Sequence, residues 1–364
     1  MAAMSSSSHP IHGRRTVLVL GGGNALGAYL AGAYERLHER SIEPHWVIGA
    51  SIGAITGAII AGNAPEHRMP RLKEFWEQAK IHSGFTLHRG SSFRHAYNEA
   101  HTALALLTGR PGLFGHRFPG LLSVLPWMPS DVALYDQRPL RQTLERLIDF
   151  TRLNAGGIRF TAICVDVETG EEVLFDTARD EITPDHLLAS TSITPVFPPI
   201  EIGGRFLCDP GYTNNLPVDV ALVNPPEEDM LCIAFELVSL KAPRPLSLDA
   251  SAERANDLIL ASSSRRSIEA LQREYALHER LKPKGAKVTL LHLAYQSGSD
   301  ERAGKAFDFS PASLEDRWAT GLRDMEQALA QLETAPREKT RLTIVRLDPE
   351  KAASSAETGA RARA

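Results

Sequence analysis

The segment Trp46-Val-Ile-Gly-Ala-Ser-Ile-Gly53 joins a short apolar run to a stretch of small and apolar residues that continues to Gly62. Short apolar runs bounded by glycine are typical of strands that are buried on both faces of a parallel sheet. Glycines two positions to either side of Ser51, at Gly49 and Gly53, permit a sharp strand-to-helix turn. Such a turn lifts the serine hydroxyl out of the sheet and onto the tip of the following helix.

The same strand–turn–helix pattern occurs once earlier in the chain. Thr16-Val-Leu-Val-Leu20 predicts a buried strand, glycines follow it, and Ala25 to Arg40 shows helical spacing of apolar residues. Two such units in succession favour an α/β fold with a parallel sheet and right-handed crossovers. We therefore expect a three-layer α/β/α architecture with a mainly parallel central sheet.

Composition indicates an ordinary globular protein. The 364 residues, 43% hydrophobic and 23% charged, are enough for one large domain with a buried core. A net charge of −4 gives no sign of nucleic-acid binding. The cysteines, Cys164, Cys208 and Cys232, are odd in number and lack zinc-site spacing. We therefore expect a reducing compartment, with no disulfide framework and no metal site.

No secretory or membrane-spanning signal is visible. Met1 to Arg15 lacks an apolar segment, and the longest apolar stretch, Gly49 to Gly62, is shorter than the ~18 residues of a span. We expect a cytoplasmic protein whose contact with a membrane would be peripheral.

The expected organisation has four parts. They are a disordered leader (1–13), a catalytic core (14–220) with a lid candidate (84–139), a C-terminal continuation packed on the core (221–348), and a disordered tail (349–364). Periodicity predicts further helices at Glu66–Lys80, His95–Leu107, Pro139–Ile148, Ala250–Leu281 and Ser313–Leu332, the last with a capping box formed by Ser313 and Asp316. It predicts further strands at Phe160–Val165, Glu172–Phe175, Leu231–Phe235 and Lys287–Leu293.

The glycine-rich turn Gly21-Gly-Gly-Asn-Ala-Leu-Gly27 lies between the first strand and the first helix. Such a turn aims backbone N–H groups at one point, which suits a phosphate or a developing oxyanion. A dinucleotide site is disfavoured, because Asn24 takes the place of the second glycine of a G-x-G-x-x-G motif that starts at Gly22. The second strand also lacks the acidic residue that binds ribose. A tight turn without a ligand remains the plain alternative.

A serine nucleophile needs a base. The usual hydrolase order would require His278 or His292, which fall in a predicted helix and a predicted strand. Asp209 is the better candidate, because it ends an apolar segment and enters a loop rich in Gly, Asn and Pro. A buried carboxylate whose pKa is raised can act as a base. A structural turn aspartate is the alternative interpretation.

Together these motifs resemble the patatin-like phospholipase family, whose hallmarks are a glycine-rich turn, a G-x-S-x-G elbow and a downstream D-G-[GA]. Ala189-Ser-Thr-Ser-Ile-Thr-Pro-Val-Phe-Pro-Pro199 is similar to the segment that precedes the aspartate in that family. The Gly-Ala-Tyr sequence at Gly27 and the segment Phe307 to Trp318 resemble a bacterial subgroup. The resemblance extends roughly from Arg15 to Leu332.

The resemblance implies a Ser–Asp dyad and a serine esterase acting in lipid degradation. Ser51 would be the nucleophile, Asp209 the general base, and the backbone N–H groups of Gly22, Gly23 and Asn24 the oxyanion hole. Carboxylic esters of glycerophospholipids or neutral acylglycerols would be cleaved through an acyl-enzyme. Neither a metal ion nor another cofactor is expected.

Departures from the family pattern define the alternatives. Asn24 replaces a glycine, Leu26 replaces a basic residue that would bind phosphate, and D-G-[GA] is Asp209-Pro210-Gly211. Proline holds φ near −65°, so a family glycine with positive φ would leave Asp209 misplaced. A catalytically impaired lipid-binding or scaffold protein is therefore one alternative, and a nucleotide-binding protein using the Gly21–Gly27 turn is another.

The apolar segment from Leu113 to Met128 is a candidate lid or interfacial patch. Its alternative is a loop folded onto the core. The nearby basic residues Arg110, His116 and Arg117 would suit an anionic lipid surface.

Overall fold

The computed structural model describes residues 14–81, 93–242, 244–297, 301, 304–334 and 340–347. The leader and the tail that the sequence predicts, at 1–13 and 349–364, lie outside these residues. So does the beginning of the predicted lid.

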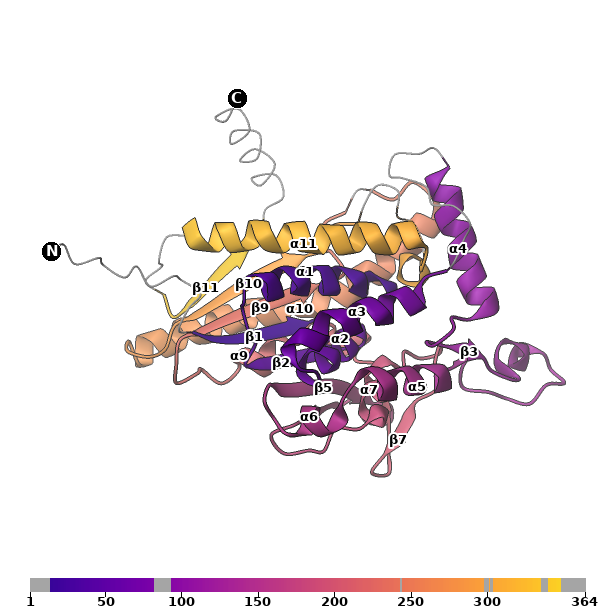
Figure 1. The fold of residues 1–364 in the computed structure, drawn as a ribbon, viewed down its shortest axis with the longest axis horizontal. Coiled ribbons are helices and arrows are strands. Elements are labelled where there is room, and N and C mark those ends of the chain that lie inside the picture. Colours follow the sequence, from indigo (N-terminus) through magenta and orange to yellow (C-terminus); the bar gives the residue numbers. More distant parts are fainter. Residues whose placement is uncertain are drawn as a thin grey trace.

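A nine-stranded sheet forms the centre of the molecule (Figure 1). Its order is β11-β10-β9-β1-β2-β5-β8-β7, and β6 also pairs with β5. The strands are β1 (Arg15–Leu20), β2 (Trp46–Ala50), β5 (Arg159–Asp166), β6 (Glu172–Asp176), β7 (Ile200–Ile202), β8 (Arg205–Cys208), β9 (Met230–Glu236), β10 (Val288–Ala294) and β11 (Leu342–Arg346). The six strands from β11 to β5 run parallel, whereas β6, β7 and β8 pair in antiparallel fashion. The expected mainly parallel sheet is thereby confirmed.

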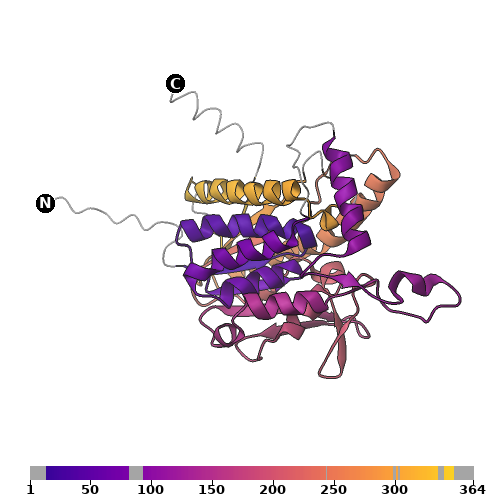
Figure 2. The same cartoon turned by 45° about the vertical axis from the view of Figure 1, so that its right-hand side comes forward.

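Helices cover both faces of the sheet. Leu18 and Leu20 of β1 join a core with residues of α1 (Ala28–Glu39), α2 (Ile52–Ala61), α3 (Pro65–Ala79) and α11 (Pro311–Thr334). Val17 and Val19, which point the other way, pack with residues of α9 (Val218–Leu222) and α10 (Leu248–Leu281). A strand that is apolar on both faces requires a helical layer on each. The three-layer α/β/α architecture is therefore confirmed (Figures 1 and 2).

The remaining elements are helices, 3₁₀ helices and a small two-stranded sheet. They are the 3₁₀ helices η1 (Asn24–Gly27), η2 (Gly120–Val124) and η3 (Lys305–Phe307), the two-residue strands β3 (Gly115–His116) and β4 (Tyr135–Asp136), and the helices α4 (Arg94–Thr108), α5 (Arg138–Leu147), α6 (Phe150–Asn154), α7 (Pro184–Thr191) and α8 (Gly211–Asn214). The helices found near predicted positions differ from the predictions by a few residues at their ends. Across the described ranges, no helix is both long enough and apolar enough to cross a bilayer.

The predicted start of the last helix is wrong. Ser313 was expected to cap the helix, but α11 begins at Pro311 and Ser313 lies inside it. Proline suits the first turn of a helix, where its missing N–H would have no partner in any case. The Ser313 N–H instead donates to Ser310 Oγ at 3.4 Å, so Ser310 takes the capping position.

Candidate active site

Ser51 occupies a strained backbone position between β2 and α2. Its φ is 55° and its ψ is −127°, a conformation that costs a residue with a side chain on the order of 1–3 kcal/mol. The tight turn depends on its glycines: a Cβ at Gly53 would lie 2.1 Å from the carbonyl oxygen of Leu20, and one at Gly49 would lie 2.5 Å from the backbone of Ala54. The Ser51 N–H donates to Ser190 Oγ at 3.1 Å, which holds the elbow in place.

Asp209 follows β8 and is buried, with 5% of its surface exposed. Its Oδ1 accepts a hydrogen bond of 2.8 Å from the N–H of Gly211. Pro210 between them has φ −80° and ψ 5°, an angle that proline adopts without strain. Position 210 therefore needs no positive φ here, and Asp209 lies in the cavity wall with Pro210 beside it.

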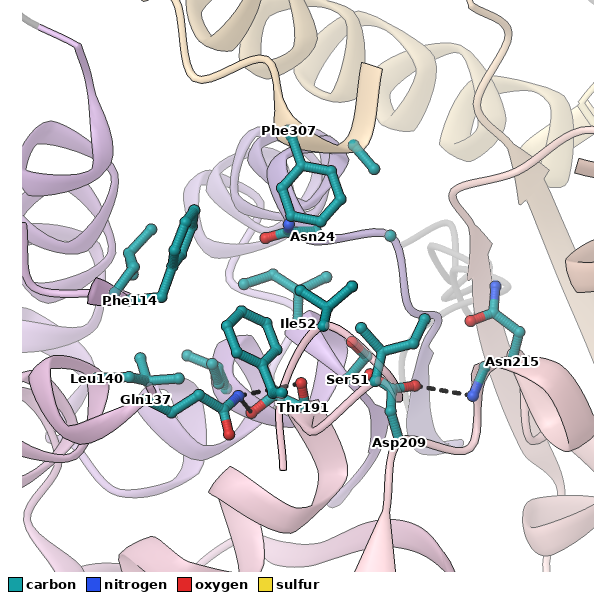
Figure 3. A pocket seen from close by; sticks show the side chains of 18 of the residues that line it. Asn24, Ser51, Ile52, Phe114, Gln137, Leu140, Thr191, Asp209, Asn215 and Phe307 are labelled. Atoms are coloured by element: carbon teal, nitrogen blue, oxygen red, sulfur yellow. Dashed lines mark hydrogen bonds between the residues drawn. The ribbon is translucent and has the colours of Figure 1, made fainter. Parts of the chain in front are cut away.

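The Ser51 and Asp209 side chains meet on the wall of one cavity (Figure 3). Burial raises the pKa of Asp209 from its ordinary 3.8 to about 6, and hydrogen bonds from the Ser51 side chain and the Gly211 N–H oppose that shift. At neutral pH the carboxyl is therefore mainly ionised, yet it is more basic than a solvated aspartate. A carboxylate with these properties can accept the proton of a hydroxyl that donates to it.

The glycine-rich turn presents fewer free N–H groups than the sequence predicts. The Gly22 N–H donates to the carbonyl oxygen of Asn215 at 3.1 Å, so it is not available to an oxyanion. Within the described part of the chain, no acceptor lies within hydrogen-bonding distance of the N–H groups of Gly23 and Asn24, and both residues line the cavity. Asn24 has φ 51°, an angle that asparagine tolerates better than most residues. Gly23 and Asn24 therefore remain candidates for oxyanion donors, whereas the N–H of Gly22 is already taken.

Asn215 is a site residue that the sequence analysis missed. Besides accepting from the Gly22 N–H, it donates from Nδ2 to the Gly22 carbonyl oxygen at 3.2 Å, and it is 3% exposed. A Cβ at Gly22 would lie 2.5 Å from Asn215 Oδ1 and 2.9 Å from Ser51 Cβ. Asn215 thus links the loop that carries Asp209 to the glycine-rich turn. The signal in the sequence was its place six residues after the aspartate in a polar loop.

The cavity has a volume of about 210 Å³ and a mainly apolar wall. Its apolar members are Ile52, Ile55, Phe75, Trp76, Leu113, Phe114, Leu140, Ile193, Val196, Phe197, Leu260, Phe307 and Phe309. Gln137 adds a polar group, but its Nε2 already donates to the backbone and hydroxyl oxygens of Thr191, each at 3.1 Å. Among the described residues that line the cavity, only Asp209 carries an ionisable carboxyl, and none is Lys, Arg or His.

Neither histidine of the triad alternative lies in this wall. His278 is exposed on α10, and His292 is buried with its Nε2 3.0 Å from Glu236 Oε2. The described residues of the cavity therefore offer Asp209 as the nearest base for Ser51.

The segment from Leu113 to Met128 divides into two parts. Leu113 and Phe114 are buried in the cavity wall, whereas the side chains from Phe118 onward are largely exposed. Its basic neighbours do not form the expected anionic-lipid surface. Arg110 is buried and donates to the carbonyl oxygens of Ala79 and Lys80, and Arg117 is paired with Asp131.

Two family models match this chain. Residues 18–222, more than half of the chain, match the model of the patatin-like phospholipase family. Residues 261–347 match a second model, described as patatin phospholipase. The chain therefore belongs to the patatin-like phospholipase family.

Individual similar proteins are distant. M110.7 of Caenorhabditis elegans, named for a patatin-like phospholipase domain, is 25% identical over 205 residues, which are 56% of this chain and 15% of that protein. The VipD structure from Legionella pneumophila is 14% identical with a TM-score of 0.41, over 87% of this chain and 67% of VipD. Human GIVD cytosolic phospholipase A2 is 10% identical with a TM-score of 0.39, over 89% of this chain and 60% of that one.

Proposed function

We propose that the protein is a lipid acyl hydrolase in which Ser51 and Asp209 form a catalytic dyad. One observation carries the proposal: a strained serine at a helix tip and a buried carboxylate with a pKa of about 6 line the same apolar cavity. Backbone strain and a raised carboxyl pKa both cost stability, and they occur together where function requires them.

The proposed reaction is ester hydrolysis in two steps. The Ser51 oxygen attacks the ester carbonyl carbon while Asp209 takes the hydroxyl proton. The oxyanion of the tetrahedral intermediate accepts hydrogen bonds from the N–H groups of Gly23 and Asn24. Collapse of the intermediate releases the alcohol, which receives the proton from Asp209, and leaves an acyl group on Ser51. Water activated by Asp209 then attacks the acyl-enzyme, and the carboxylic acid is released.

The wall of the cavity favours a substrate that is uncharged near its scissile ester. Among the described lining residues there is no cation to pair with a phosphate, and Leu26 stands where the family commonly has a basic residue. Burying an unpaired phosphate charge would be costly. We therefore propose neutral acylglycerol-type esters as preferred over glycerophospholipids, with the acyl chain against the aromatic and aliphatic side chains.

The decisive test is covalent labelling with a fluorophosphonate probe. The unaltered chain should be labelled once and Ser51→Ala not at all, whereas Ser262→Ala, a half-buried residue of α10 outside the cavity wall, should be labelled normally. Hydrolysis of a p-nitrophenyl ester should disappear in both Ser51→Ala and Asp209→Asn. Normal labelling of Ser51→Ala would refute the assignment of the nucleophile.

The alternative of an impaired lipid-binding or scaffold protein has lost part of its basis. It rested on Asn24 and Pro210, and both adopt backbone angles that their residue types allow. It would be favoured again if the chain bound lipid without turnover and Pro210→Gly switched turnover on. Membership of the bacterial subgroup and a cytoplasmic location with peripheral membrane contact stay predictions.

A further inference from the structure

The segment between β3 and β4 stands away from the rest of the molecule (Figures 1 and 2). Its large apolar side chains are exposed to an unusual degree: Phe118 by 77%, Leu121 by 67%, Val124 by 75% and Trp127 by 76%. Soluble proteins rarely expose apolar side chains in such a contiguous group unless the group meets a partner.

The projecting segment, Phe118-Pro-Gly-Leu-Leu-Ser-Val-Leu-Pro-Trp-Met-Pro-Ser130, contains no charged residue. In a chain with 23% charged residues, such a run points to an environment that excludes charge. Protein interfaces typically contain about one hydrogen bond per 100–200 Å². The side chains of this segment offer only two hydroxyls and one indole N–H for such bonds. Contact with lipid hydrocarbon involves no hydrogen bonds, and tryptophan favours the boundary between lipid and water.

The base of this segment is held firmly, so its exposure does not come from fraying. Arg117 Nε donates to both carboxylate oxygens of Asp131, at 2.8 and 3.0 Å, and the Gly120 N–H donates to Asp131 Oδ2 at 3.1 Å. Strands β3 and β4 pair across the stem. The ion pair also neutralises Arg117, so apolar contact is the main attraction that residues 118–130 offer.

The stem leads directly into the cavity wall. Leu113 and Phe114 line the cavity just before β3, and the Phe114 ring packs against Tyr135 in β4 at 5.1 Å between centroids. The Tyr135 hydroxyl donates to the carbonyl oxygen of Leu106 in α4, where Leu107 is 73% exposed. A surface that receives the segment would therefore lie next to the cavity.

We propose that residues 118–130 insert into the surface of a lipid layer and hold the cavity against it. The proposal rests on the proposed lipid hydrolase function and names the lipid–water interface as the partner of that site. Attraction comes from burial of apolar surface, so binding does not require anionic lipid.

The first experiment measures sedimentation with phosphatidylcholine vesicles, using the Ser51→Ala chain to exclude turnover. Replacing Phe118, Leu121, Val124 and Trp127 by Ser should lower the partition coefficient by about 100-fold or more. The matched control is Leu277→Ser with Leu281→Ser, which removes side chains that are 57% and 79% exposed, about 30 Å along α10 from the cavity residue Leu260. The control should bind like the unaltered chain.

The second experiment separates insertion from electrostatic adsorption. Adding phosphatidylserine or raising the salt concentration should change the partition coefficient by less than about threefold, because screening weakens only charge-based attraction. The emission of Trp127 should shift to the blue on vesicle binding, and Trp127→Phe should remove most of that shift while retaining binding. A steep fall in binding with salt would overturn the proposal.

The third experiment distinguishes this proposal from the proposed catalysis. On a soluble short-chain p-nitrophenyl ester, the fourfold Ser variant should keep the kcat/KM of the unaltered chain, since the four residues do not line the cavity. On an emulsified acylglycerol its turnover should fall at least tenfold. If the unaltered chain does not hydrolyse the soluble ester, the catalytic proposal is refuted. The insertion proposal is not, because vesicle binding by Ser51→Ala tests it separately. Equal vesicle binding by the fourfold variant would overturn the insertion proposal and assign the segment to a protein partner.

Discussion

Asp209 is the residue on which the proposed chemistry depends most, through its carboxyl group. Removing it from water disfavours its charged form, while the Ser51 side chain and the Gly211 N–H stabilise that form. The net result, a pKa of about 6, leaves a base that is ionised at neutral pH and stronger than an ordinary aspartate. The same burial makes the ionised residue costly for the fold.

Activity should therefore follow the ionisation of Asp209. We expect kcat/KM for a soluble ester to rise with pH and to reach half its maximum near pH 6, because only the carboxylate can accept the Ser51 proton. The measurement is the pH–rate profile between pH 4.5 and 8. A profile that is flat between pH 5 and 7 would exclude Asp209 as the base.

Asp209→Asn should abolish activity but make the folded protein more stable at neutral and higher pH. The folded-state pKa lies above the unfolded value, so the folded state binds the proton more tightly. The contribution of Asp209 to stability is thus greatest below about pH 4 and is lost as the pH rises through about 6. Asparagine keeps an acceptor for the Gly211 N–H but carries no charge, so we expect a gain of about 1–3 kcal/mol at pH 8.

Thermal unfolding of both proteins at several pH values checks this expectation. The gain should shrink as the pH falls toward 4, where the native carboxyl is protonated. A variant that is less stable than the unaltered chain at pH 8 would contradict it.

We infer that Asn215 is a positioning residue, because it holds the glycine-rich turn through its hydrogen bonds with Gly22. Asn215→Ala removes the bond from Nδ2 to the Gly22 carbonyl oxygen, and we expect kcat to fall about 10- to 100-fold with little change in KM. The neighbouring Asn214→Ala is the control, since Asn214 bonds to Glu172 and Asp219 instead. Steady-state kinetics that showed equal losses of kcat in both variants would indicate a general structural effect.

At the scale of elements, the strand–turn–helix units were predictable because each is encoded locally. Strands β1, β2, β5, β9 and β10 are continuous apolar runs, and a run that is apolar on both faces has few other stable environments. Strands β7 and β11 were missed because they are short or partly exposed, whereas β8 was expected as the apolar strand that Asp209 ends. Helix α7 was missed although Thr183 and Pro184 supply a recognisable start, with a capping box to His186.

The elbow itself should be intolerant of a single methyl group. In Gly53→Ala the new Cβ would lie 2.1 Å from the Leu20 carbonyl oxygen, forcing α2 away from β1. We expect a loss of about 3 kcal/mol or more, or failure to fold, because backbone on both sides cannot yield cheaply. Gly157→Ala, whose Cβ would have no neighbour within 4 Å, should leave the denaturation midpoint almost unchanged. Equal stability of the two variants would contradict this view of the elbow.

At the scale of the whole molecule, Arg317 of α11 joins segments that are far apart in the chain. This fully buried side chain pairs with Glu301 and donates to the carbonyl oxygens of Ala25, Lys305 and Asp308. Ala25 belongs to the turn that carries the oxyanion donors, and Lys305 begins the η3 segment of the cavity wall. Arg317 thus connects the last long helix to two sides of the site.

Removing that guanidinium should be strongly destabilising. Arg317→Leu leaves the buried carboxylate of Glu301 without its cation and with only the Tyr295 hydroxyl as a donor, so we expect a loss of about 3–5 kcal/mol. Arg323→Leu, an exposed substitution on the same helix, should change the free energy of unfolding by less than about 1 kcal/mol. Chemical denaturation measures both, and a small loss in Arg317→Leu would show that the cluster contributes little.

The sequence alone determined the α/β class, the elbow at Ser51 and the choice of Asp209, because each rests on apolar periodicity or on residues adjacent in the chain. Only the tertiary structure decided which N–H groups are free, since the Gly22 N–H is taken by Asn215 nearly two hundred positions later. It also decided that Pro210 adopts an unstrained backbone angle and that Phe118 and Trp127 are exposed while Phe114 is buried. Hydrogen-bond partners and burial depend on segments that folding brings together, and no local pattern records them.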